Sequence, residues 1–262
     1  MDDLVSIVMP SYNTGKYIAD SIKSILNQTY GNWELIIVDD CSTDDTDAIV
    51  AGFQDARIRY YKNDKNAGAA VSRNRALREA KGRYIAFLDS DDIWRADKLA
   101  LQLDFMKKNG YAFTYTDYRI QLNGTWLPYV NTGPDRVDKR KLYNYCYFST
   151  ITVLYDAEVV GLIQIEDLRK HNDYAMWFQA VEKTDCHRLP ECLSYYIKHD
   201  GSVSSGSKFK LMKHHYILFR KGLHKGAFLS AVLTGNNVIH GFIKKCKYKR
   251  YLEAEEERDV PV

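Results

Sequence analysis

Three carboxylates, Asp89, Asp91 and Asp92, fall within four residues of the 262-residue chain, directly after an apolar run over residues 84–88. Crowded carboxylates repel one another unless a cation lies between them. A divalent ion with oxygen ligands would relieve the repulsion and would also neutralise a diphosphate. The alternative is a helix N-cap, because Asp is favoured before a helix and residues 93–105 are a candidate helix. A cap needs only one Asp, so three favour a cation site.

Apolar runs and helical spacing alternate through the first hundred residues. The predicted strands cover residues 4–9, 34–38, 58–61 and 84–88, and the predicted helices cover residues 16–28, 46–53 and 69–80. The strands are short apolar runs typical of buried sheets, whereas the helical segments have apolar residues three and four positions apart. This alternation predicts an α/β fold with a parallel sheet and helices on both of its faces.

Polar clusters follow all four predicted strands, and they begin at Ser11, Asp39, Asn63 and Asp89. The ligand crevice of such a sheet lies outside the carboxyl ends of its strands, so the clusters predict a site at that edge. No G-x-G-x-x-G follows the first strand, and no G-x-x-x-x-G-K-[ST] occurs in the chain. The site is therefore not an ordinary dinucleotide or P-loop pocket.

The chain beyond residue 100 is less regular. Residues 114–120 and 150–154 are predicted strands, and residues 122–145 are predicted loops. Residues 173–181 have the apolar spacing of a helix, in which we expect Trp177 to lie in the core.

Six short motifs follow one another between residue 4 and about residue 205. They are Val8-Met9-Pro10-Ser11-Tyr12-Asn13, Ile37-Val38-Asp39-Asp40-Cys41-Ser42-Thr43-Asp44, Asn66-Ala67-Gly68 with Arg73-Asn74, Phe87-Leu88-Asp89-Ser90-Asp91-Asp92, Asn172-Asp173-Tyr174-Ala175-Met176-Trp177, and Tyr196-Ile197-Lys198-His199-Asp200-Gly201-Ser202-Val203-Ser204. Together they resemble the family-2 glycosyltransferases of GT-A fold. The resemblance implies a mixed, mainly parallel sheet in a catalytic domain over residues 1–205. Residues 1–100 would form its nucleotide-sugar-binding half and residues 101–205 its acceptor-side half.

The resemblance implies roles in binding the donor, carried over position by position. Pro10 and Tyr12 would line the nucleotide base and ribose, and Asp40 would accept the hydrogen of uracil N3. Asn66 would belong to the same donor site, and Arg73 would lie near the nucleotide or its diphosphate. The implied donor is a nucleotide-diphosphate sugar, with UDP as the nucleotide.

The resemblance also implies the residues of the reaction. Asp89 would lie on the ribose side, and Asp91 would ligate Mn2+ or Mg2+, with His199 as a further metal or diphosphate contact. Asp173 would be the general base that takes a proton from the acceptor hydroxyl. A base and a metal-held leaving group on opposite faces of the sugar mean single displacement with inversion.

Structural explanations for several of these residues stay open. Tyr12 would pack on the sheet edge, Asp40 would cap the next helix, and Arg73 would pair with Glu79 or with a carboxylate at the sheet edge. His199 would be a core histidine. The motifs also depart from the family at two positions, since Asn172 stands where many relatives have Glu and Ile197 stands where an Arg is common.

The function indicated is an inverting glycosyltransferase that moves a sugar to a hydroxyl of a glycan or lipid-linked saccharide, as in assembly of bacterial surface polysaccharide. Two alternatives are weighed. A sugar-nucleotide pyrophosphorylase would have a Gly-rich N-terminal loop, which the sequence lacks. A non-catalytic carbohydrate-binding protein would not need Asp40, Asp91 and Asp173 together.

The charge of the chain is divided unevenly. Residues 201–262 contain 12 basic and 5 acidic residues, and none of the acidic ones precedes Glu253. Apolar residues alternate with the basic ones, so we expect residues 206–262 to form a basic, amphipathic helical tail that binds an anionic membrane. The alternative is a helical pair that packs on the catalytic domain. No nucleic-acid fold signature accompanies the basic residues, so nucleic acid is not a predicted partner.

The N-terminus is acidic and has no basic region before its first apolar run, so no signal peptide is predicted. No run of 18 apolar residues occurs that would span a membrane. We therefore expect a cytoplasmic protein that is peripheral on the inner face of the cytoplasmic membrane.

Overall fold

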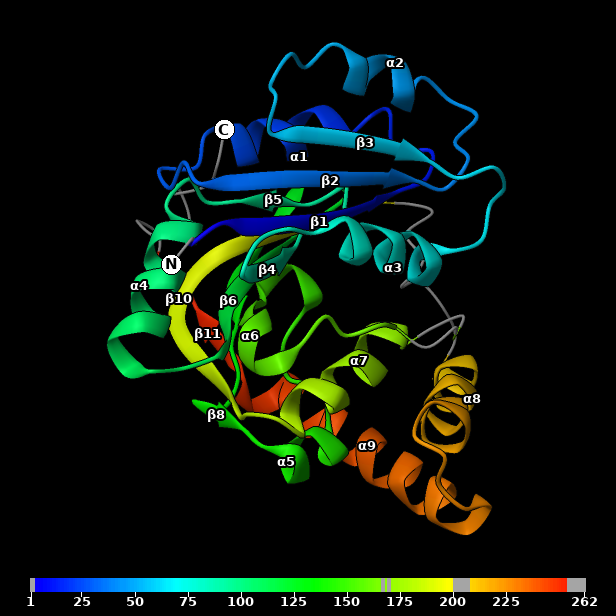
Figure 1. Ribbon diagram of the computed structural model, residues 1–262. Helices are drawn as coiled ribbons and strands as arrows, with labels where there is room; N and C mark the ends of the chain where they lie inside the picture. Colours follow the sequence, from blue (N-terminus) through cyan, green and yellow to red (C-terminus); the bar gives the residue numbers. More distant parts are fainter. Residues whose placement is uncertain (1–2, 166–167, 169–170, 200–207, 254–262) are drawn as a thin grey trace.

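One mixed sheet contains all strands of the described residues (Figure 1). Its order is β11-β7-β6-β9-β4-β1-β2-β3, and β10 extends it by pairing with β5, β6 and β8. The computed structural model describes residues 3–165, 168, 171–199 and 208–253. The predicted boundary at residue 205, the motif residues 200–204 and the acidic end from residue 254 lie outside these ranges.

The first half of the chain forms the parallel part of the sheet. Its strands are β1 (Val5–Ser11), β2 (Trp33–Asp39), β3 (Ile58–Lys62) and β4 (Tyr84–Phe87), connected by α1 (Ile18–Leu26), α2 (Thr46–Ala51) and α3 (Ala69–Glu79). Every residue of β1 and β2 is buried, because helices cover both faces of the sheet. Ile7 packs in the same cluster as Ile22 of α1, whereas Val8 packs with Leu77 of α3. The predicted fold class is confirmed.

The second half of the domain adds antiparallel strands and further helices. Its elements are β5 (Ile93–Trp94), α4 (Lys98–Asn109), β6 (Phe113–Leu122), β7 (Thr125–Asn131), β8 (Arg136–Val137), α5 (Lys139–Asn144), the 3-10 turn η1 (Thr150–Thr152), β9 (Leu154–Asp156), α6 (Ala157–Val160), α7 (Asn172–Val181) and β10 (Cys186–Lys198). The long strand β10 runs parallel to β6 and ends beside the segment that follows β4. The two halves therefore share one sheet.

The structure corrects three of the predicted elements. Residues 93–105 are not one helix, because Ile93 and Trp94 pair with β10 and the helix begins only at Lys98. Residues 122–145 are not all loop, since they contain β7, β8 and α5. Residues 150–154 are only partly strand, because η1 precedes β9. No element was predicted for β10.

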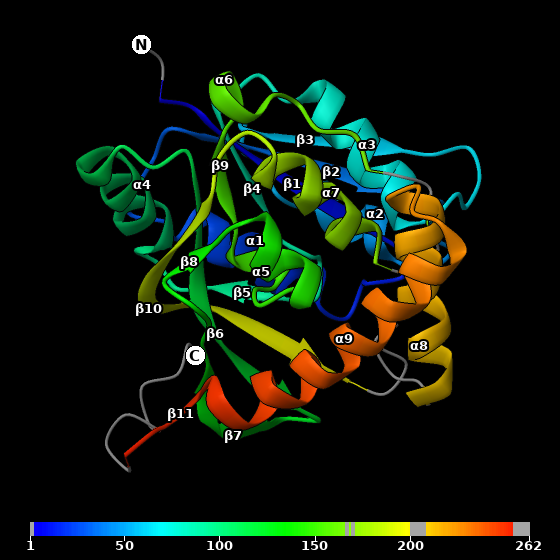
Figure 2. The ribbon, with the colours of Figure 1, turned by 90° about the horizontal axis from the view of Figure 1, so that it is seen from below.

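The C-terminal segment is helical and packs on the domain. It contains α8 (Lys208–Ile217), a π-helical turn η2 (Leu218–Gly222), α9 (Ala227–Lys247) and β11 (Lys249–Tyr251). Figure 2 shows α8 and α9 side by side at one flank of the domain, with α9 leading to β11 and β7. Asn237 of α9 donates to the Tyr174 hydroxyl at 2.9 Å, and β11 pairs with β7. No helix of the described residues has the length and apolar content needed to cross a membrane.

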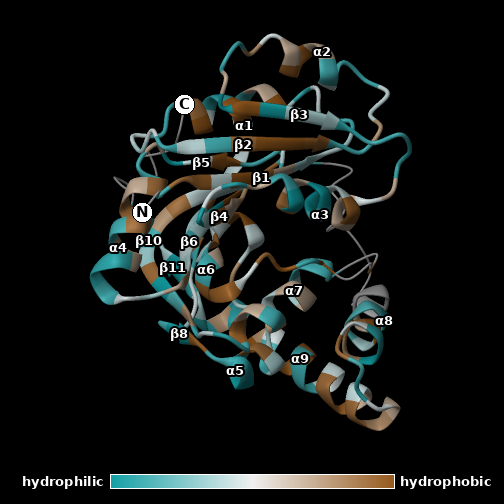
Figure 3. Ribbon diagram, in the orientation of Figure 1, coloured by the Kyte–Doolittle hydropathy of each residue, from teal (hydrophilic) through white to brown (hydrophobic). Residues whose placement is uncertain are grey.

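The faces of α9 are reversed relative to an ordinary surface helix. Its buried residues are the polar Ser230, Thr234 and Asn237. Its outward face is apolar, and Phe228, Ile239 and Phe242 have exposed fractions of 84%, 62% and 71%. Brown, apolar segments recur along α9 in Figure 3. The helix α9 thus has one polar and one apolar face, and the direction of the apolar face could not be read from its sequence. The basic, membrane-binding tail over residues 206–262 stays a prediction.

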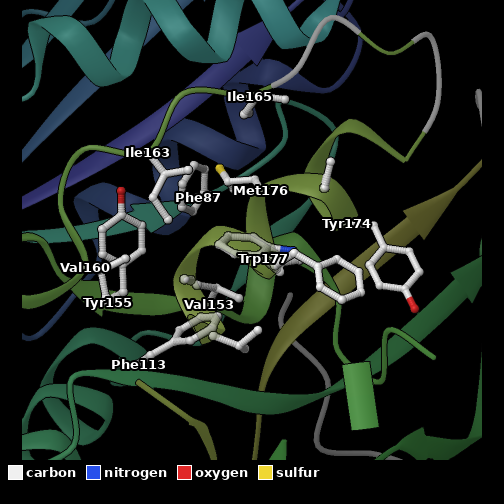
Figure 4. Packing of buried hydrophobic residues seen from close by; sticks show 14 of the residues in the cluster. Phe87, Phe113, Val153, Tyr155, Val160, Ile163, Ile165, Tyr174, Met176 and Trp177 are labelled. Carbon is white, nitrogen blue, oxygen red and sulfur yellow. The ribbon is translucent and has the colours of Figure 1, made fainter. Parts of the chain in front are cut away.

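The core beneath the site is aromatic and is centred on Trp177 of α7 (Figure 4). The Trp177 ring lies 5.5 Å from that of Phe87 and 5.6 Å from that of Phe113, measured between centroids. Trp177 has no exposed surface, as predicted. These ring contacts fix α7 against β4 and β6, which positions the first turn of α7 at the strand ends.

Candidate active site

The carboxyl ends of the parallel strands meet at one edge of the sheet, as predicted. The backbone N–H of Asp40, after β2, donates to the carbonyl of Ser11 at the end of β1 at 2.8 Å. The N–H of Leu88, after β4, donates to the carbonyl of Val8 at 3.1 Å. The polar residues after β1, β2 and β4 therefore lie along a common edge.

A buried guanidinium, that of Arg73 on α3, lies where this edge meets α7. Its Nη2 donates to Asp89 Oδ1 at 2.5 Å, and its Nη1 makes a longer contact of 3.4 Å with Asn172 Oδ1. Burial lowers the pKa of Arg73, but the charges of Asp89, Asp173 and Asp91 outweigh burial and raise it. Of the predicted alternatives for Arg73, pairing with Glu79 is wrong, because Glu79 pairs with Arg59.

The carboxylate of Asp91, after β4, lies close to the imidazole of His199, after β10. His199 Nε2 lies 3.2 Å from Asp91 Oδ2, and the His199 ring stacks on Tyr17 with 4.4 Å between centroids. Burial raises the pKa of Asp91 most, the charge of Asp89 raises it further, and His199 opposes both. A bound cation would relieve this accumulation of negative charge.

The third carboxylate, Asp92, has a structural role. It is fully buried, and its Oδ1 accepts the N–H of Ile197 at 2.8 Å, which joins the segment after β4 to the end of β10. Burial, followed by the charges of Asp91 and Asp89, raises the pKa of Asp92 well above its usual range. The N-cap alternative for this cluster is wrong, because the next helix begins at Lys98 after the N-cap residue Asp97.

The site offers few side chains that could ligate a metal ion. Within the described ranges, no group of three or more His, Cys, Asp or Glu side chains is placed to hold a metal ion. The pair formed by Asp91 and His199 offers one carboxylate oxygen and one imidazole nitrogen. These donors fit an ion such as Mn2+ or Mg2+ that takes its other ligands from phosphate and water.

The candidate base, Asp173, lies in the first turn of α7 with its carboxylate held on both oxygens. The Thr150 hydroxyl of η1 donates to Asp173 Oδ2 at 2.7 Å, and the N–H of Tyr174 donates to Oδ1 at 2.8 Å. Asn172 accepts the N–H of Asp173 at 2.7 Å through its side-chain oxygen. The family departure at Asn172 thus supplies an acceptor both to Arg73 and to the backbone at Asp173.

The predicted nucleotide-binding residues lie at the ends of β1 and β2. Pro10 is buried in β1, whereas Tyr12 and Asn66 are exposed. Asp40 is buried, and it accepts hydrogen bonds from the N–H groups of Ala67 and Gly68, and from the Asn63 amide. Asp40 therefore holds the loop before α3 rather than capping α2.

The structure brings together Arg73, Asp89, Asp91, Asp173 and His199, which the sequence places on four separate segments. Sequence reasoning missed Thr150, which contacts the candidate base, and Tyr17, which stacks on His199. Thr150 falls in a predicted strand, and a hydroxyl residue there carries no signal of a catalytic contact. Tyr17 falls at an apolar position of the helix predicted over residues 16–28, which gives no signal of its contact with His199.

The chain is similar in sequence to known proteins. The sequence profile "Glycosyl transferase family 2" matches residues 6–160. The Escherichia coli UDP-Glc:alpha-D-GlcNAc-diphosphoundecaprenol beta-1,3-glucosyltransferase WfgD is 40% identical over 220 residues, which cover 82% of this chain and 85% of WfgD. WfaP of Escherichia coli, described by the same activity, is 37% identical over 245 residues, which cover 93% of this chain and 96% of WfaP.

Among solved structures, S. aureus TarS in complex with UDP-GlcNAc superposes with a TM-score of 0.71, covering 91% of this chain and 72% of the TarS chain. The two sequences are 21% identical, so this likeness shows a shared GT-A fold. It does not show which ligand this chain binds.

We predict that the substitution Arg73→Met lowers the free energy of unfolding by about 2–3 kcal/mol, because it leaves the carboxylate of Asp89 without its partner. The cost is held below that of a fully buried pair by the 28% exposure of the Asp89 side chain. Chemical denaturation measures the change. The control is Arg78→Met on the exposed face of the same helix, which should cost less than about 0.5 kcal/mol. Equal costs for the two variants would contradict the structural role of Arg73.

Proposed function

The chain belongs to glycosyl transferase family 2, and we propose that it transfers a sugar from a UDP-sugar to a hydroxyl of a lipid-linked saccharide, with inversion at the anomeric carbon. It is a glycosyltransferase by family and by its relatives. This membership sets aside the two alternatives drawn from the sequence, a sugar-nucleotide pyrophosphorylase and a non-catalytic carbohydrate-binding protein. The donor, the acceptor, the metal and the base are the proposed parts.

The contact of Arg73 with both Asp89 and Asn172 is the observation that carries the proposal. It brings the carboxylates after β4 and the carboxylate of Asp173 within the field of one guanidinium. A transferase needs a leaving-group side and a base side around one sugar. Asp89 and Asp91 suit the first side, and Asp173 suits the second.

A divalent ion, Mn2+ or Mg2+, is proposed to be held by Asp91 and His199. When bound, it supplies positive charge that stabilises the diphosphate as it leaves. Asp89 and Arg73 would orient the ribose and diphosphate beside these two ligands. Pro10, Tyr12, Asp40 and Asn66 would bind the nucleoside at the ends of β1 and β2, with Asp40 accepting the N3 hydrogen of uracil.

Asp173 is proposed to take the proton of the acceptor hydroxyl. The acceptor oxygen then bonds to the anomeric carbon, and the bond from that carbon to the diphosphate oxygen breaks. Thr150 and the N–H of Tyr174 each engage one oxygen of Asp173, so the carboxylate cannot rotate freely. Thr150 is therefore a positioning residue for the base.

The acceptor proposal rests on the relatives and on α9. WfgD and WfaP are both described as acting on a saccharide linked by diphosphate to undecaprenol. The outward apolar face of α9 suits insertion at the surface of a membrane, where such an acceptor is found. Lys245 and Lys247 are exposed at the end of the same helix, which fits an anionic lipid surface. We therefore propose that the protein works at the inner face of the cytoplasmic membrane.

We predict that Asp173→Asn lowers turnover by about two to four orders of magnitude, because it keeps the shape of the side chain and removes the base. Donor affinity should change less than about twofold, since the base does not hold the nucleotide. Release of UDP in the presence of acceptor measures turnover, and calorimetry with UDP measures affinity. A variant that transfers sugar at nearly the original rate would refute the role of Asp173.

We predict that Asp91→Asn weakens Mn2+-dependent binding of UDP by at least about tenfold, as expected for loss of a charged ligand. The control Asp104→Asn removes an exposed carboxylate on α4 and should leave the affinity unchanged. Calorimetry with UDP, with Mn2+ and with a chelator, gives the comparison. Equal affinity of wild type and Asp91→Asn would rule out Asp91 as a ligand, and equal affinity with and without Mn2+ would rule out the metal.

We predict that the protein binds vesicles containing phosphatidylglycerol and that the triple substitution Phe228→Ser, Ile239→Ser, Phe242→Ser abolishes this binding. Each apolar side chain removed takes away buried area at the interface, and each basic residue near the surface adds about 1 kcal/mol that salt screens. Co-sedimentation at low and high salt measures the effect, with vesicles of phosphatidylcholine alone for comparison.

The matched control is Val159→Ser with Leu162→Ser, which removes two exposed apolar side chains far along the chain from α9. This double variant should bind vesicles as the wild type does. Loss of binding in both variants, or no binding by the wild type, would refute a membrane role for α9. A concentration-dependent dimer that disappears only in the triple variant, without vesicle binding, would assign the face to self-association instead.

A further inference from the structure

Lys244 is a cation of the C-terminal helix that points toward the catalytic domain. The inward residues of α9 recur at intervals of four and three, and they are Ser230, Thr234, Asn237, Gly241 and Lys244. A Cβ added at Gly241 would lie 2.9 Å from a ring carbon of Tyr145, so the helix approaches the domain closely here. Lys244 is one turn further and partly buried. It is thus on the face opposite the apolar one.

Lys244 lacks a counter-ion in the part of the chain that the structure describes. Its Nζ donates a long hydrogen bond, 3.4 Å, to the carbonyl of Cys146, and no carboxylate of the described residues forms a salt bridge with it. Burial lowers the pKa of Lys244 to about 8. A cation that is partly removed from water without a paired anion is costly, and residues with perturbed pKa values cluster at functional sites.

Tyrosine rings surround the ammonium group. Its Nζ lies 5.3 Å from the centroid of the Tyr145 ring and 6.0 Å from that of Tyr118. Both tyrosines are partly exposed, so a ligand has access to them. Phenol hydroxyls donate to phosphate oxygens, and the ring faces accept the apolar faces of sugars.

Lys244 and the proposed base lie near the same residue, Cys146. The Cys146 carbonyl accepts from Lys244. Burial raises the pKa of the Cys146 thiol to about 12, the charge of Asp173 raises it as well, and Lys244 opposes. Asn237, two turns before Lys244, donates to the hydroxyl of Tyr174, the residue after Asp173. The inward face of α9 is therefore attached to the first turn of α7, which carries Asp173.

We propose that Lys244, with the hydroxyls of Tyr118 and Tyr145, binds the diphosphate that links the acceptor saccharide to its lipid. The inference rests on the proposed function, because it takes the acceptor to be lipid-linked. The saccharide hydroxyl then lies at Asp173, the diphosphate at the inward face of α9, and the lipid beyond the helix, whose outward face meets the membrane. One helix would thus contact both the diphosphate and the lipid of the acceptor.

Calorimetry with farnesyl diphosphate tests the subsite directly. UDP and Mn2+ are present in excess to fill the donor site, and farnesol serves as the probe without phosphate. The wild type should bind farnesyl diphosphate more tightly than farnesol. Lys244→Met should weaken the diphosphate by about 10- to 100-fold, the usual worth of a charge-assisted contact, and should leave farnesol unchanged. Lys244→Arg, which keeps the charge, should stay within about threefold of the wild type.

The matched control is Lys221→Met, which removes the same charge from an exposed position in η2. It should bind farnesyl diphosphate as the wild type does. Thermal unfolding of both Met variants shows that they fold. Equal affinity of Lys244→Met and wild type would overturn the proposal, and so would an equal loss in Lys221→Met, which would mean nonspecific attraction by the basic tail.

The pH dependence gives a second readout. The Lys244 ammonium loses its proton as pH rises through its lowered pKa, so the wild type should lose affinity for farnesyl diphosphate between about pH 7 and 9, whereas Lys244→Arg should not. The titratable groups in contact with Lys244 are Tyr118, Tyr145 and Cys146, and burial raises the pKa of each. None of these three ionises in that interval, so a profile that is flat for the wild type would count against Lys244.

Steady-state kinetics separates this proposal from the proposed function. With a diphosphate-linked acceptor, Lys244→Met should raise KM for the acceptor and leave KM for the donor unchanged. Alkyl saccharides, which lack the diphosphate, serve as comparison acceptors. The subsite is refuted if the wild type transfers sugar to them as well as to diphosphate-linked acceptors and if Lys244→Met does not alter the rate of transfer to alkyl saccharides. A wild type that transfers to no lipid-linked saccharide would refute the proposed acceptor, whatever its affinity for farnesyl diphosphate.

Discussion

The guanidinium of Arg73 is the charge around which the site is arranged. It is buried, and a buried charge must be paired. The carboxylate that pairs with it is that of Asp89, after β4, whereas the start of α7 contributes the amide oxygen of Asn172 and the nearby charge of Asp173. Without this cation, Asp89, Asp91 and Asp173 would repel one another; with it, they converge. Arg suits this position because it stays charged under these conditions and offers several donors in one plane.

The parallel half of the fold was predictable because each of its elements is locally consistent. β1 and β2 are mainly apolar runs, and every residue of both is buried. The strand β10 was not predictable, since Pro190 and Glu191 interrupt its pattern and its register with β6 shifts between Leu189 and Cys192. Ile93 and Trp94 begin the candidate helix that the sequence suggests over residues 93–105, but pairing with β10 decides their conformation. Long-range pairing overrides local preference in these segments.

Some residues of the candidate site were also predictable from the sequence, whereas others were not. Asp89 and Asp91 are two positions apart and directly follow a recognisable strand, so the sequence alone identifies them as candidate site residues. The contact between Arg73 and Asn172 joins residues 99 positions apart, and no spacing rule reveals it. Thr150 reaches Asp173 only because η1 replaces the strand expected there. Chemistry-bearing residues were thus identifiable from motifs, whereas the residues that orient them depend on tertiary contacts.

The reversed faces of α9 follow from how the helix is attached. Hydrogen bonds from Asn236 to Asn144 and from Asn237 to Tyr174, and the pairing of β11 with β7, hold its polar side inward. A helix attached by apolar contacts would have hidden Phe242 and exposed Lys244. In water this arrangement leaves apolar surface unburied, which costs free energy in proportion to its area. The cost would disappear if that face entered a lipid interface, as proposed above. Phe242 and Lys244 lie within one turn of α9 but on opposite sides of it. An acceptor that is half lipid and half saccharide, as proposed, would therefore meet an apolar surface and a cation on the two sides of a single helix.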